Sequence, residues 1–194
     1  MSVVAATISS VTGPAPNPFA VVGVNSTRGY GISWSETGSY QAVAISLELR
    51  TFGIATGNAY LTTKVGSGTT ASDEVASTSF NFPANPTSVV LFTGLTLAAG
   101  TYYLTISGVS GTGGWDGTDS PTPTTAPGVT QNSNYAVGDS SSPLPSYPPS
   151  GQISSAGVLK YAVVGTSAPE PQSTLLLLLG LFCACISRIR RQSA

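Results

Sequence analysis

The stretch best suited to chemistry is Gly113–Asp119, where a tryptophan adjoins two carboxylates, Asp116 and Asp119. Two carboxylates that face one cleft are what acid–base hydrolysis of a glycosidic bond requires. The neighbouring Trp115 ring offers a surface on which a sugar ring could stack, and carboxylate oxygens are also the ligands that Ca²⁺ prefers. The competing interpretation is a polar Asp-Gly turn in which Trp115 covers a sheet edge. We treat Trp115, Asp116 and Asp119 as candidates for ligand binding and assign no catalytic residue.

Other catalytic arrangements are excluded or lack a supporting pattern. The chain has no histidine, so a Ser-His-Asp triad is impossible. Its two cysteines, Cys183 and Cys185, lie in an apolar C-terminal run, which leaves the rest of the chain without a thiol nucleophile, a disulfide or a His/Cys metal site. Lys64 or Lys160 would have to act as the base of a Ser-Lys pair, and no spacing favours this. We therefore expect no enzyme, no metal and no cofactor.

The composition favours short strands joined by turns. Only 8% of the 194 residues are charged, and the chain contains 22 Gly and 14 Pro. This is far from a helical composition and is typical of all-β domains. Four basic and seven acidic residues precede Pro169, a net charge of −3, so the basic stripe that nucleic-acid binding needs is missing.

Alternating side chains predict the strands that would position these residues. Between Tyr40 and Arg50, apolar residues at every second position face one way and polar or small residues face the other, which indicates a half-buried strand. Ala59–Val65 and Val158–Val164 alternate in the same way. The segment Leu95–Ile106 contains a glycine turn between two strand-like runs and predicts a β-hairpin.

Two segments are predicted as loops. Residues 7–19 contain three alternating prolines, and residues 108–157 are rich in Pro, Ser, Thr and Gly, with half of all prolines between 121 and 149. A loop this long is usually functional or mobile. Only Tyr135–Val137 within it is expected to contact the sheet. In total, about eight short strands predict a β-sandwich over residues 7–166, jelly-roll-like or Greek-key in topology.

The C-terminal tail, residues 167–194, has a different character. Pro169, Glu170 and Pro171 precede an apolar run that includes five consecutive leucines, and Arg188, Arg190 and Arg191 follow it. No charge falls in the 17 residues between Glu170 and Arg188, which as a helix would span roughly 26 Å, just short of a bilayer core. The alternatives are a buried C-terminal helix and a removable lipid-anchor signal. Neither explains the terminal arginines, so we predict a membrane helix over 173–187 with the arginines on the cytoplasmic side.

This tail resembles the PEP-CTERM sorting signal of exported bacterial proteins, which consists of a Pro-Glu-Pro motif, a leucine-rich membrane helix and a terminal arginine cluster. The resemblance covers the tail alone. It implies recognition by an exosortase, a membrane-embedded cysteine protease that processes such proteins near the motif. The remainder of the chain resembles, more loosely, the small β domains found ahead of such tails. The resemblance implies passage through the inner membrane to the cell surface or extracellular matrix.

The N-terminus conflicts with this expectation. Residues 1–6 lack a basic region and a long apolar run, so they do not form a complete signal peptide. Val4-Ala5-Ala6 is nevertheless a small-residue pattern of the kind found at signal cleavage sites. The hypothesis is that residues 1–6 are the end of a longer export signal.

Two functions from different classes follow from these patterns. The first is a non-enzymatic surface or extracellular-matrix protein, sorted through its tail, with an exosortase and the membrane as partners. The second is an extracellular carbohydrate-binding or calcium-binding module that uses Trp115, Asp116 and exposed tyrosines, with extracellular polysaccharide as the partner.

Overall fold

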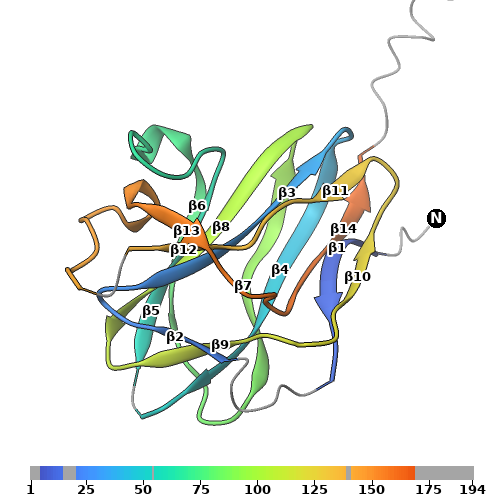
Figure 1. Ribbon diagram of the computed structural model, residues 1–194. Coiled ribbons are helices and arrows are strands. Elements are labelled where there is room, and N and C mark those ends of the chain that lie inside the picture. The colour runs from blue at the N-terminus through green and yellow to red at the C-terminus, as the bar shows by residue number, and fades with distance from the viewer. Residues whose placement is uncertain (1–4, 15–20, 54, 139–140, 169–194) are drawn as a thin grey trace, which may run out of the picture.

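The computed structural model describes residues 5–14, 21–53, 55–138 and 141–168, and these form a β-sandwich of two antiparallel seven-stranded sheets (Figure 1). The prediction of an all-β sandwich is therefore confirmed. Sheet A follows the order β10 (Thr122–Thr125), β1 (Ala6–Thr12), β14 (Tyr161–Ser167), β4 (Tyr40–Thr51), β9 (Gly113–Asp116) and β2 (Val21–Val24), with β7 (Thr87–Leu97) also paired to β4.

Sheet B lies against sheet A and carries the remaining strands. Its order is β13 (Ile153–Ser155), β12 (Tyr135–Val137), β3 (Gly29–Glu36), β8 (Gly100–Ser110), β5 (Thr56–Thr62) and β6 (Glu74–Asn81), with β11 (Val129–Gln131) also paired to β3. Two short 3₁₀ turns complete the described elements, η2 (Ala71–Asp73) and η3 (Pro148–Ser150). Within the described residues, no helix is long and apolar enough to cross a membrane. The helix predicted over 173–187 lies outside these residues.

The core lies between the two sheets, and β4 shows how the sequence builds it. Val43, Ile45, Leu47 and Leu49 are fully buried, whereas the residues between them are partly exposed, as the alternation predicts. Burying each such side chain contributes roughly 1.5–3 kcal/mol. Sheet B supplies the facing layer, to which Ile32, Trp34, Leu61, Leu104 and Ile106 belong.

The predicted hairpin over Leu95–Ile106 is wrong. The two strands exist, but β7 pairs with β4 in sheet A whereas β8 pairs with β3 and β5 in sheet B. The short connection between Leu97 and Gly100 therefore crosses from one sheet to the other. The Tyr102 hydroxyl stabilises this corner by donating a hydrogen bond to the Ala98 carbonyl oxygen at 2.8 Å.

The two predicted loops also contain strands. Within residues 7–19, β1 occupies Ala6–Thr12 and pairs with β14 and β10. Within residues 108–157, five strands from β9 to β13 join one or the other sheet. The proline-rich segment thus contributes strands to both sheets, and Tyr135–Val137 is one of several points where it joins a sheet.

Candidate functional site

Trp115 lies in the core and offers no surface to a ligand. It belongs to β9, which pairs with β4 on one side and β2 on the other. Its ring is fully buried, and its indole Nε1–H donates a hydrogen bond to the Lys160 carbonyl oxygen at 2.8 Å. A sugar ring cannot stack on it without opening the sandwich, so the structure corrects the ligand-binding interpretation of this residue.

Asp116 is equally unavailable, because Arg50 neutralises it. The guanidinium of Arg50 donates from Nε and Nη2 to the two carboxylate oxygens at 2.6 and 2.7 Å, a bidentate ion pair. Asp116 is fully buried, and its hydrogen bonds raise the pKa of Arg50 above its ordinary value. Both oxygens are therefore occupied, which corrects the assignment of Asp116 to Ca²⁺ or sugar binding.

The remaining carboxylates do not assemble into a site with Asp116. Asp119 is exposed beyond the end of β9. Asp73 accepts a hydrogen bond from the Thr70 backbone N–H at 2.9 Å and so caps η2, and Glu74 accepts one from the Tyr147 hydroxyl at 2.9 Å. Over the described ranges, no group of three or more His, Cys, Asp or Glu residues is placed to hold a metal ion.

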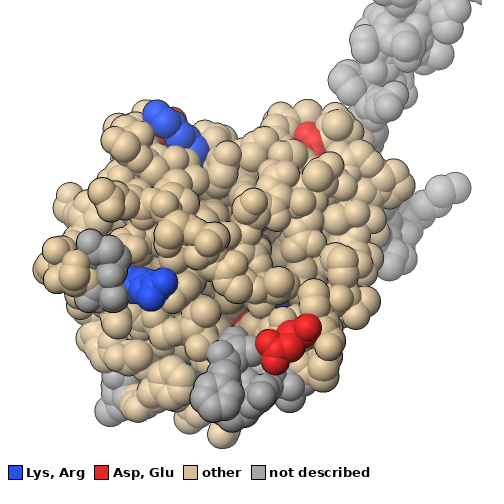
Figure 2. All heavy atoms as spheres, in the orientation of Figure 1, with Lys and Arg blue, Asp and Glu red and all other residues tan. Residues whose placement is uncertain are grey.

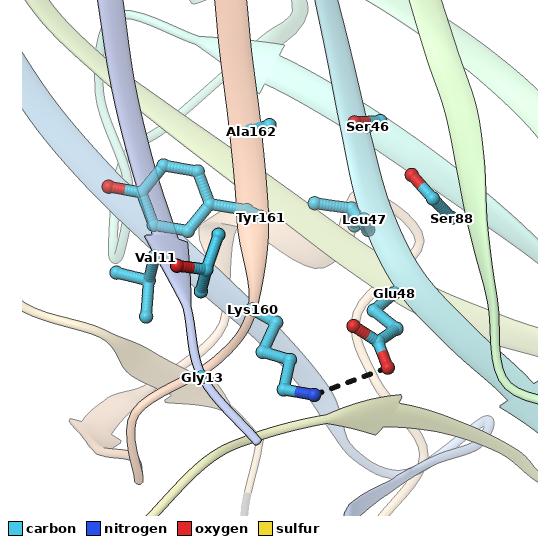
Figure 3. Close-up of a pocket in the computed structure, with 10 residues that line it drawn as sticks. Val11, Gly13, Ser46, Leu47, Glu48, Ser88, Lys160, Tyr161 and Ala162 are labelled. Carbon is cyan, nitrogen blue, oxygen red and sulfur yellow. Dashed lines mark hydrogen bonds and ion pairs between the residues drawn. The ribbon is translucent and has the colours of Figure 1, made fainter. Parts of the chain in front are cut away.

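A pocket of about 140 Å³ surrounds Lys160, on the face formed by β1, β14 and β4. Figure 3 shows the Lys160 amine directed at Glu48, with an Nζ–Oε1 distance of 3.3 Å, and the serines Ser46 and Ser88 farther away. The other lysine considered above, Lys64, donates to the Gly68 carbonyl oxygen at 3.2 Å. The described geometry therefore gives no support for a Ser-Lys catalytic pair.

A second pocket, of about 410 Å³, opens between the edges of the two sheets. The consecutive polar residues 131–134 line it together with two prolines. Two of its three amide side chains already donate within the protein, Asn132 to the Ser35 hydroxyl at 2.9 Å and Asn134 to the Gly157 carbonyl oxygen at 3.0 Å. It contains no aromatic ring, which is the usual anchor for a sugar.

A third hollow, of about 270 Å³, lies on the outer face of sheet B, over β5 and the edge strand β6. Tyr60 and Ser77 are direct cross-strand partners there, and Asn58 and Ser79 form the next pair on the same face. The Ser79 hydroxyl donates to Asn58 Oδ1 at 2.8 Å, and Asn58 Nδ2 donates to the Tyr60 hydroxyl at 3.3 Å. We call this hollow the Tyr60 groove; its lining is Asn58, Tyr60, Ser77, Thr78 and Ser79.

Part of the proline-rich segment, residues 141–152, packs against the outer side of sheet B beside this groove. Pro148 and Pro149 are buried, and the Pro149 carbonyl oxygen accepts a hydrogen bond from the Gly66 N–H at 2.7 Å. The ring of Tyr147 contacts Tyr60 edge-on, with ring centroids 5.3 Å apart. This contact, and the hydrogen bond from Tyr147 to Glu74, hold one wall of the groove in place.

Sequence reasoning missed Glu36, the most perturbed carboxyl among the described residues. The residue is only 3% exposed, and one carboxylate oxygen, Oε1, is buried without a hydrogen-bond partner. Loss of hydration raises the pKa of this carboxyl to about 7, although the hydrogen bond from Trp34 opposes the shift. The sequence could have indicated that Glu36 is buried, because Ile32, Trp34 and Glu36 share one face of a strand.

Charge is sparse on the molecule as a whole. Figure 2 shows Lys, Arg, Asp and Glu atoms as a few separate spots on a face that is otherwise uncharged.

No protein-family model matches the chain, and no curated protein matches it.

Proposed function

We propose that the chain is an exported surface or extracellular-matrix protein that is sorted and processed through its C-terminal tail and acts without catalysis. The observation that carries the proposal is the point where the sandwich ends. The Ala168 backbone N–H donates to the Ser39 carbonyl oxygen at 2.8 Å, and the next residue is Pro169 of the Pro-Glu-Pro motif. Cleavage near this motif would leave every described hydrogen bond of the domain intact.

The tail supplies the remaining parts of the proposal. Pro169 and Pro171 disfavour a helix at the motif, so the chain would be extended there, as a protease requires. A membrane helix over 173–187 would hold the motif at a constant height above the bilayer, and Arg188, Arg190 and Arg191 would stop transfer. Connections that pass repeatedly between the two sheets support a jelly-roll-like or Greek-key description of the domain.

The test is the intact mass of protein released from cells, compared with that of the membrane fraction. Released protein should lack Leu175–Ala194. Replacing Glu170 and Pro171 together by alanine should trap the full-length chain in the inner membrane, whereas replacing Gln172 and Ser173 by alanine should not. A released species that still contains Leu175–Ala194 would refute processing and leave a plain membrane anchor.

The second candidate function is extracellular carbohydrate binding. One observation favours it, namely a groove on sheet B lined by a tyrosine, an amide and hydroxyls without any charged residue. Its location differs from the one expected from the sequence, because Trp115 and Asp116 are buried. No observation favours the calcium-binding version, and we do not propose it.

A further inference from the structure

We propose that the Tyr60 groove is a binding site for a neutral glycan, a chain of uncharged sugar units. The inference rests on the second function above and is independent of the sorting tail. It places recognition on the outer face of β5 and β6, on the opposite sheet from Trp115 and Asp116.

Charge selects the ligand class. None of the five residues that line the groove is ionisable except the Tyr60 phenol. The next residues in register on β8, Thr105 beside Tyr60 and Ser107 beside Asn58, are also uncharged. A phosphorylated or carboxylated polymer would lose hydration here without gaining a counter-charge. A neutral polyhydroxylated chain can exchange its water hydrogen bonds for those of amide and hydroxyl groups.

The polar groups of the groove are already ordered. Asn58 is held by two side-chain hydrogen bonds, one accepted from Ser79 and one donated to Tyr60. Among the described residues, no hydrogen bond uses its second amide hydrogen or the hydroxyl hydrogen of Tyr60, so both are available to donate. Because the protein has fixed these groups before a ligand arrives, less side-chain entropy is lost on binding.

The tyrosine supplies the apolar contact. Tyr60 is partly exposed, and its contact with Tyr147 restrains the ring. A restrained tyrosine offers a large amphipathic contact area at low entropic cost, which suits the C–H face of a sugar ring. The volume of about 270 Å³ lies just below the range of roughly 300–1,000 Å³ for drug-sized ligands, so the groove fits a short stretch of a longer chain.

The experiment is affinity electrophoresis of the full chain in a polyoxyethylene detergent, which has no sugar headgroup. Gels would contain dextran, galactomannan or xyloglucan as neutral polymers, or alginate as a charged one. At least one neutral polymer should retard the protein, and alginate should not. Ser77→Lys, which places a long charged side chain in the groove, should weaken the interaction about tenfold or more. Tyr60→Ala should have the same effect.

Val75→Lys is the matched control. Val75 lies two residues before Ser77 on the same exposed face of β6, is 39% exposed and does not line the groove. Edge strands tolerate lysine, so both lysine variants should fold, which circular dichroism would verify. Retention of binding in Val75→Lys supports the site. The proposal is overturned if no neutral polymer binds, if alginate alone binds, if Ser77→Lys binds as the parent does, or if Val75→Lys loses binding equally.

The electrophoresis experiment and the mass measurement of tail processing can refute their two proposals independently. Normal processing without polysaccharide binding would remove the glycan site and leave the sorting proposal standing. Polysaccharide binding by a chain that is never processed would do the reverse.

Discussion

The Trp34 indole donates a hydrogen bond to Oε2 of Glu36 at 3.2 Å, and this bond joins two side chains of one strand inside the core. The two residues are neighbours on the inner face of β3. The bond satisfies one carboxylate oxygen and leaves the other, Oε1, buried and unpaired. One hydrogen bond does not replace the hydration that the charged form loses, so the neutral acid is favoured.

This arrangement predicts that stability depends on pH through Glu36. The pKa of the carboxyl is raised from 4.5 to about 7, so between these values the folded state binds a proton that the unfolded state has lost. Stability should therefore fall as pH rises from 4.5 to 7 and be flat above. The total loss is at most about 3–4 kcal/mol, at about 1.4 kcal/mol per pH unit. Urea unfolding followed by tryptophan fluorescence measures it.

The matched variants for this prediction are Glu36→Gln and Asp119→Asn. Glu36→Gln keeps an acceptor for Trp34 but cannot titrate, so its free energy of unfolding relative to the parent should improve as pH rises through this window. Asp119→Asn removes one exposed charge and leaves Glu36 in place, so it should keep the parent's dependence. Equal pH profiles for the parent and Glu36→Gln would show that Glu36 is not the titrating group.

The buried position of Glu36 also shows what a local pattern can predict. Strict alternation correctly predicted β4 and the inward residues Tyr161 and Val163 of β14, because a half-buried strand imprints its own period of two. The same rule places Glu36 inside. It could not identify β1, which was predicted as a loop from the prolines that follow it. A register shift between Thr7 and Ser9 breaks the alternation there, and four consecutive residues are buried.

Which strands pair with each other could not be predicted from the alternation of side chains along each strand. A strand followed by a turn and another strand looks alike whether the two pair in one sheet or face each other across the core, and β7 and β8 do the latter. The glycines before Trp115 were predicted to lie in a loop, and this error has a different cause from the pairing error. They lie in β9 because Phe82 packs directly on Gly113, where an added Cβ would come within 2.3 Å of its ring. Such a contact depends on a residue 31 positions away.

The Arg50–Asp116 ion pair should be a major stabilising contact with no role in ligand binding. Asp116→Ala leaves a guanidinium that has lost its partner, and breaking a buried pair costs about 3–5 kcal/mol. The Arg50 side chain is 25% exposed and can turn toward water, so we expect a loss near 3 kcal/mol. Asp119→Ala, at an exposed position three residues on, should change stability by less than about 0.5 kcal/mol. Equal effects of the two changes in urea unfolding would contradict this assignment.

Ala42 should be a site where glycine stabilises a strand. It has a φ of +52°, and on either side of it both Tyr40 and Val43 face the core, because the pairing with β7 shifts register there. Alanine is strained in this conformation and glycine is not. Ala42→Gly should therefore raise stability by up to about 1 kcal/mol, after allowance for the greater freedom of glycine in the unfolded chain. Ala44→Gly, on the same strand, should lower it by about 0.5–1 kcal/mol. Losses of similar size in both variants would show that Ala42 carries no strain.

The position of the cleavage site should decide whether the processed domain is fully stable. β14 pairs with β4 as far as Ser167, which lies opposite Tyr40, and the Ala168 N–H bonds to Ser39. A chain ending at Ala168 keeps all of these contacts and should unfold at the same urea concentration as the full chain. A chain ending at Thr166 loses the last pairing and that hydrogen bond. Since a net hydrogen bond contributes about 0.5–1.5 kcal/mol, it should be less stable by about 1–2 kcal/mol while keeping a β-type circular dichroism spectrum. A chain ending at Ala168 that is itself unfolded would show that the domain needs its tail, and release near Pro169 would then be incompatible with a folded product.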